Sequence, residues 1–168
     1  LLDENNEIIG RPVAYRDNRT DGIMEKVFKL ITKEDIFKKT GIQFMPFNTL
    51  FQLFALKGAH PEDINRAKTL LFVPDYINFL LSGNLITEYT IASTSQMLNA
   101  HSRDWDTNLT DLITSNSNIF NSLSRPGRTL GELSDETRKK TGLNEIRIVS
   151  VPGHDTASAV AAVPAVGK

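Results

Sequence analysis

One stretch near the C-terminal end, residues 148–160, constrains the fold of this chain more than any other. The β-branched run Arg147 to Val151 predicts a strand that stops at Pro152-Gly153. Asp155 follows, at the mouth of a small-residue segment that predicts a helix beginning at Thr156. In α/β proteins, ligands bind beyond the C-terminal ends of such strands. The pattern therefore predicts an α/β fold with Asp155 at its candidate site.

Asp155 has two interpretations on this local pattern. Its carboxylate is suited to act as a general base if a substrate hydroxyl comes within about 3 Å. Asp is equally a favoured N-cap, so it could simply begin the helix. The small residues after it, Ala157 to Ala162, allow close approach either by a ligand or by a packed sheet.

The rest of the chain predicts a helix-rich α/β domain with a small mixed sheet, in which residues 1–168 form one partial domain. Leu1-Leu2 and Ile8–Tyr15 predict a β-hairpin around an Asn-rich turn. Apolar spacing and capping residues predict helices over residues 21–31, 32–41, 48–57, 75–81, 88–98, 106–113 and 134–140, with a further turn of helix opening at His60-Pro61.

Composition narrows the class of protein. The chain has 19 basic and 20 acidic residues and a net charge of -1, which gives no electrostatic reason to expect a nucleic-acid or anionic-membrane partner. It has no cysteine, so disulfides and thiol catalysis are excluded. No apolar run approaches the roughly 20 residues of a membrane span. We therefore expect a soluble, cytoplasmic protein.

Two further motifs carry chemistry and also have structural interpretations. The charged run Arg16 to Thr20 could orient a polyhydroxylated ligand, but an Asp17–Arg19 ion pair with a cap is the more common role of such a pattern. The aromatic loop Phe44 to Asn48 could form the floor of a sugar pocket, whereas loop aromatics more often belong to the core.

Several site types are not indicated. The three histidines, His60, His101 and His154, lack the spacing of metal ligands, so the sequence predicts no metal site. No Gly-x-Ser-x-Gly elbow supports a hydrolase. Neither of the common glycine-rich phosphate loops occurs, so no nucleotide site is predicted within this chain.

Three segments taken together resemble a known family. The runs Pro12–Thr20, Gly41–Leu53 and Gly153–Val160 are similar to the rhamnulokinase branch of the FGGY carbohydrate kinases, and Val73–Gly83 is similar to the middle of that family's N-terminal domain. The resemblance covers nearly the whole chain. It implies part of an actin-like, ribonuclease H-like ATPase domain.

The resemblance also implies an activity and its residues. The expected reaction is transfer of the ATP γ-phosphate to the C1 hydroxyl of L-rhamnulose, a small-molecule sugar, in rhamnose catabolism. Asp155 falls at the family's catalytic base, His154 and Thr156 beside it at sugar contacts, and Phe44 in the sugar pocket. ATP and Mg²⁺ are implied as cofactors.

The resemblance places other parts of the machinery outside this chain. The family's phosphate-binding hairpin would precede Leu1, and its nucleotide-binding domain would follow Lys168, so we expect this piece alone to be inactive. Thr49 and Gln52 stand where related kinases carry Lys and Trp, which favours the rhamnulokinase branch. Two alternatives stay open: a kinase for another ketose or polyol, and a non-catalytic α/β sugar-binding module. The oligomeric state is not predicted.

Overall fold

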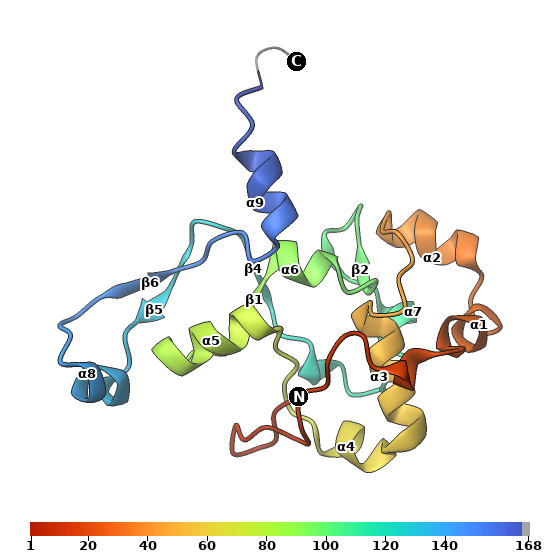
Figure 1. Cartoon of the computed structure of the whole chain (residues 1–168), viewed down its shortest axis with the longest axis horizontal. Helices are drawn as coiled ribbons and strands as arrows, with labels where there is room; N and C mark the ends of the chain where they lie inside the picture. The colour runs from red at the N-terminus through yellow and green to blue at the C-terminus, as the bar shows by residue number, and fades with distance from the viewer. Residues whose placement is uncertain (166–168) are drawn as a thin grey trace. The chain divides into compact units, whose positions relative to one another are not determined.

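The computed structural model describes residues 1–165, which form two compact units (Figure 1). Unit 1 combines Leu1–Leu70 with Ser93–Asn121, and unit 2 combines Leu71–Ala92 with residues from 122 onward. The chain therefore enters unit 2, returns to unit 1 and then enters unit 2 again. Nine α-helices and six short strands are assigned within the described residues, which confirms the predicted helix-rich α/β class.

Unit 1 is mainly helical. Its elements are the 3₁₀ turn η1 (Asn18–Thr20), α1 (Ile23–Phe28), α2 (Lys33–Thr40), α3 (Thr49–Ala59), α4 (Pro61–Arg66), β2 (Leu98–Asn99), β3 (Asp104–Trp105), α7 (Thr107–Thr110) and the 3₁₀ turn η2 (Ser117–Ile119). Strands β2 and β3 pair antiparallel. The helix signals read from the sequence hold well for α2, because Thr32 accepts a hydrogen bond from the Asp35 N–H as N-cap and Gly41 is the C-cap.

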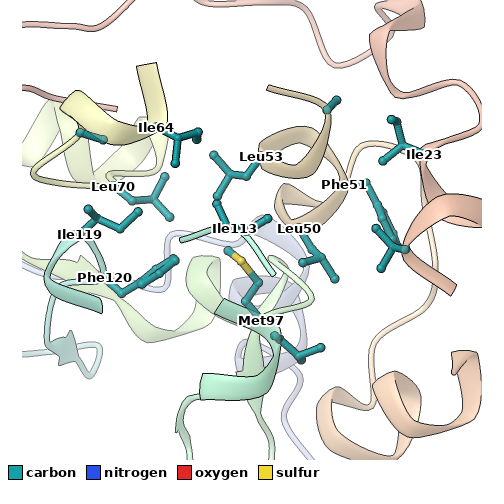
Figure 2. Packing of buried hydrophobic residues seen from close by; sticks show 14 of the residues in the cluster. Ile23, Leu50, Phe51, Leu53, Ile64, Leu70, Met97, Ile113, Ile119 and Phe120 are labelled. Atoms are coloured by element: carbon teal, nitrogen blue, oxygen red, sulfur yellow. The ribbon is translucent and has the colours of Figure 1, made fainter. Parts of the chain in front are cut away.

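The apolar core of unit 1 gathers side chains from segments far apart in the sequence. Figure 2 shows Leu50, Phe51 and Leu53 of α3 among residues of the later segment such as Met97 and Ile113. Leu50 and Phe51 are completely buried. The backbone ties the same segments together, since the Leu50 N–H donates to the Ser95 carbonyl at 3.0 Å. Burial of this apolar face, more than helix propensity, stabilises the short helices.

Two predictions in unit 1 are wrong in extent. The hairpin expected over Ile8–Tyr15 is reduced to a single bridge between Leu2 and Ile8, because Pro12 has no N–H to donate and Gly10 turns the backbone with a φ of 74°. The helix expected over 106–113 is confined to α7, after which the chain continues as a turn in which the Ile113 N–H donates to the Thr110 carbonyl at 2.9 Å. The Asp106 carboxylate at its start binds Lys39 Nζ at 2.9 Å and Asn99 Nδ2 at 3.0 Å.

Unit 2 contains α5 (Val73–Ser82), β1 (Thr87–Glu88), α6 (Tyr89–Ser93, all but its last residue), β4 (Leu123–Ser124), β5 (Thr129–Glu132), α8 (Asp135–Thr141), β6 (Arg147–Val149) and α9 (Asp155–Ala161). Strands β1 and β4 pair in parallel, and β5 and β6 pair antiparallel. The expected small sheet is thus distributed over separate two-stranded pairs. The predicted strand over 147–151 ends two residues early.

The helix predicted over 88–98 is the main error in this part of the chain. The segment forms β1 and the short helix α6 and then passes through Gln96, whose φ of 66° is left-handed, to β2. Gln96 is fully buried, and its side-chain amide donates to the Ile42 carbonyl at 2.8 Å. That long-range bond fixes a conformation that the local pattern does not reveal.

The core of unit 1 gives a direct test of burial. We expect Leu50→Ala to lower the free energy of unfolding by about 2–5 kcal/mol, because it leaves a cavity among close-packed side chains. Leu30→Ala is the matched control in the same unit, at a residue that is 62% exposed, and it should change that free energy by less than about 1 kcal/mol. Urea unfolding of both variants measures the difference, and equal losses would contradict the placement of Leu50.

Candidate active site

The predicted strand–turn–helix arrangement is present in unit 2. Strand β6 is followed by a turn through Pro152 and Gly153, and α9 begins at Asp155. One detail of the prediction is wrong: His154 is the N-cap, and Asp155 is the first residue of the helix instead of its cap. A carboxylate in the first turn is favoured by the positive end of the helix dipole.

The Asp155 side chain is open to solvent, with 97% of its surface exposed. Its Oδ1 accepts hydrogen bonds from the Thr156 N–H at 2.6 Å and the Thr156 hydroxyl at 3.2 Å. His154 Nε2 lies 3.8 Å from the same oxygen, beyond hydrogen-bond distance. These contacts orient the carboxyl without enclosing it, so a substrate hydroxyl can reach it.

A buried carboxylate lies behind this turn. Glu88, at the end of β1, is 2% exposed. Its Oε2 accepts from the Gly153 N–H at 2.9 Å, and the Thr90 hydroxyl, which donates to Oε2, accepts from the His154 N–H at 3.3 Å. The carboxylate therefore joins the start of α6 to the turn that carries Asp155.

A second buried acid supports Glu88. Asp75, in the first turn of α5, is 1% exposed, and its Oδ1 accepts the Glu88 backbone N–H at 3.0 Å. Within residues 1–165, its Oδ2 has no hydrogen-bond partner. Desolvation, together with the neighbouring Glu88 charge, raises the pKa of Asp75 to about 7 despite the backbone hydrogen bond.

The sequence alone did not indicate these two acids. The pattern placed Glu88 at the start of a long helix and Asp75 at the start of another, roles in which acidic residues are usually exposed. The one local signal was that Glu88 stands between Thr87 and Tyr89-Thr90, a β-branched and aromatic setting typical of a strand.

Phe44 lies in unit 1, where its ring is partly buried against the core. It makes edge contacts with Phe28 at 5.2 Å between ring centroids, and Lys33 Nζ lies 5.3 Å from the centre of its ring. These contacts match the core interpretation of the aromatic loop. The assignment of Phe44 to a sugar pocket stays a prediction.

The charged run Arg16 to Thr20, before α1, has only part of the structural role expected of it. Asp17 caps η1 by accepting from the Arg19 N–H at 2.9 Å. The Arg19 guanidinium donates instead to Gln52 Oε1 at 2.7 Å, so the expected Asp17–Arg19 ion pair is replaced by a hydrogen bond to α3.

Arginines line a hollow that the sequence did not suggest. It has a volume of about 430 Å³ and lies beside β4, lined by Ile86, Ser122, Leu123, Ser124, Arg125 and Arg128. Asp155 is not among the residues that line this hollow.

Residues 1–165 contain no group of three or more His, Cys, Asp or Glu side chains arranged to hold a metal ion. They also include no helix with the length and apolar character that crossing a bilayer requires. The expectation of ATP and Mg²⁺ as cofactors stays a prediction.

Comparison with known proteins identifies the relatives of this chain. The sequence profile of the N-terminal domain of the FGGY family of carbohydrate kinases matches residues 1–162. A rhamnulokinase of Oceanobacillus iheyensis is 45% identical over 98% of this chain and 35% of its own length, and one of Halalkalibacterium halodurans is 42% identical over 99% of this chain and 35% of its own length. The chain thus spans about a third of the length of these curated relatives.

Solved structures agree on the fold. A xylulose kinase from Rhodospirillum rubrum superimposes with a TM-score of 0.87 at 20% identity, covering 96% of this chain and 33% of that one. A ligand-bound xylulose kinase from Lactobacillus acidophilus gives a TM-score of 0.79 at 24% identity, covering 90% of this chain and 32% of that one. The predicted fold and the family resemblance are both confirmed.

The raised pKa of Asp75 predicts a pH dependence of stability. The unfolded carboxyl titrates near pH 3.9, so between about pH 4 and pH 7 the folded state holds a proton that the unfolded state has lost. Stability from this group is complete below about pH 4 and falls as pH rises through 7, by at most about 1.4 kcal/mol per pH unit. We expect Asp75→Asn to remove that contribution. Unfolding free energies measured at pH 5 and pH 7.5 test this, and an unchanged pH dependence in the variant would contradict it.

Proposed function

The chain belongs to the FGGY family of carbohydrate kinases, and we propose that the whole protein transfers the γ-phosphate of ATP to the C1 hydroxyl of L-rhamnulose. The observation that carries this proposal is the 40–45% identity to proteins named rhamnulokinase over nearly the full chain. The xylulose kinases share the fold at under 25% identity, which gives no support for any particular sugar.

The proposed role of Asp155 is that of general base. Phosphoryl transfer depends mainly on positioning and charge stabilisation, with a carboxylate placed to accept the proton of the attacking hydroxyl. The bond from the sugar oxygen to phosphorus forms, the bond from phosphorus to the ADP oxygen breaks, and the hydroxyl proton passes to Asp155. Its 97% exposed carboxyl at the start of α9 can meet a hydroxyl directly.

Other residues contribute binding in this proposal. His154, whose side chain is 35% exposed, and Thr156 flank the carboxyl and can contact the remaining sugar hydroxyls. Phe44 is proposed to line the sugar pocket through the exposed part of its ring. ATP supplies the phosphoryl group, and Mg²⁺ would neutralise its charge. We place the protein in the cytoplasm.

The general-base role predicts a large effect of a small change. In the full-length protein, Asp155→Asn should lower kcat for L-rhamnulose by about 100-fold or more, because an amide cannot accept the proton. Asp135→Asn is the matched control, since Asp135 is also the exposed first residue of a helix, and it should retain the rate. A coupled assay of ADP release measures both. A wild-type rate in Asp155→Asn would contradict the general-base role and favour the non-catalytic interpretation of this residue.

Substrate identity needs a separate experiment. We expect the full-length protein to turn over L-rhamnulose with a kcat/KM at least about 10-fold above that for D-xylulose and glycerol, because a site built on hydroxyl contacts rejects sugars that leave those contacts unpaired. A faster reaction with another ketose or polyol would favour the sibling-kinase alternative. Residues 1–168 alone should release no ADP, because they represent about a third of the length of the relatives.

A further inference from the structure

The Glu88 carboxylate is held by an unusual set of partners. Oε1 accepts the Thr90 N–H at 2.7 Å, and Oε2 accepts the Thr90 hydroxyl at 2.5 Å, the Ile91 N–H at 3.1 Å and the Gly153 N–H at 2.9 Å. All four donors are uncharged. Removing a carboxylate from water is costly unless such bonds replace its hydration. The arrangement is thus stable only while α6 and the turn keep their positions.

The turn before Asp155 is fixed to this carboxylate through its backbone. Gly153 approaches so closely that a Cβ built on it would lie 3.3 Å from Glu88 Oε2 and 3.5 Å from the Ile91 and Pro74 Cβ atoms. The His154 N–H donates to the Thr90 hydroxyl at 3.3 Å. On the other side of the turn, the Ser158 hydroxyl donates to the Pro152 carbonyl at 2.9 Å.

Asp155 itself has no comparable anchor. The hydrogen bonds of its carboxyl within the described residues go to Thr156, the next residue along the same helix. Its direction therefore depends on where the turn places the first residue of α9. The residues that hold the turn consequently set the position of the carboxyl relative to a substrate.

We propose that Glu88, acting through Thr90, is a positioning residue for the phosphoryl transfer, because it fixes the backbone of Gly153 and His154 and thereby the direction of the Asp155 carboxyl. The inference rests on the proposed function of Asp155 as base. It assigns a role in catalysis to a buried acid that would not itself touch the substrate.

Substitutions at Glu88 and Thr90 separate this role from a general contribution to stability. Glu88→Gln replaces one accepting oxygen by an NH₂ group that would face N–H donors. Thr90→Val removes the hydroxyl that links Glu88 to His154, while Thr90→Ser keeps it. Thr141→Val, at an exposed Thr at the end of α8, is the control for the loss of a hydroxyl in the same unit.

In the full-length protein we expect Glu88→Gln to lower kcat by about 10- to 100-fold, since small misplacements of a reacting group cost rates of this order. Thr90→Val should lower kcat by about 10-fold, whereas Thr90→Ser and Thr141→Val should stay within about twofold of wild type. The KM for ATP should change by less than about twofold in every variant. Thermal melting confirms that each variant is folded at the assay temperature. If Glu88→Gln is unfolded there, the comparison of Thr90→Val with Thr90→Ser decides the outcome.

A double variant supplies the decisive measurement. In an Asp155→Asn background, Thr90→Val should lower the remaining rate by less than about threefold, because residues that act through one another are not additive. A full additional 10-fold loss would show that Thr90 acts independently of Asp155 and would overturn the inference. So would wild-type kcat in both Glu88→Gln and Thr90→Val. A failure of the proposed function is distinguishable from either result. If Asp155 is not the general base, the single variant Asp155→Asn keeps a wild-type kcat.

Discussion

Unit 2 depends on the buried Glu88 carboxylate, which accepts hydrogen bonds from protein groups in place of water. Glu88 receives N–H and O–H groups from α6 and from the turn before α9, and its own backbone N–H is held by Asp75 of α5. Three segments separated by up to 78 positions in the sequence (residues 75 to 153) thus meet at two buried acids. A local dielectric lower than that of water strengthens these bonds and makes the loss of any one of them costly.

The two units are stabilised in different ways. Unit 1 buries a contiguous apolar cluster that includes Val27, Ile36 and Phe51, all with no exposed surface. In unit 2 the most buried positions include Asp75, Thr87 and Glu88, while Val73, Val151 and Val160 are largely exposed. Polar networks specify geometry more narrowly than apolar contacts, since hydrogen bonds depend on direction as well as distance. Such a network suits the accurate placement of the Asp155 carboxyl that we propose.

Because the chain belongs to the FGGY carbohydrate kinases, the arrangement of Asp155 and Glu88 can be related to phosphoryl transfer. A phosphotransferase needs little covalent participation from its side chains and much positioning. In the roles that we propose, Asp155, exposed at the first turn of a helix, meets the substrate hydroxyl, and Glu88, buried behind it, keeps Asp155 in place. The contacts that Phe44 and Arg19 make in unit 1 are ring packing against Phe28 and a hydrogen bond to Gln52.

The sequence by itself determined the class of fold, the strand–turn–helix around Asp155, and helices such as α2 and α8, because these features depend on capping residues, glycines and apolar spacing within a few positions. The family was also recognisable from short motifs, whereas the site residues that they indicated stay predictions. Only the tertiary structure decided that 88–98 breaks into β1 and α6, that the Ile8–Tyr15 strand does not form, and that Asp75 and Glu88 are buried. The break at 88–98 and the burial of Glu88 depend on hydrogen bonds between distant residues, such as Gln96 with Ile42 and Glu88 with Gly153. Such bonds leave no periodic pattern in the sequence.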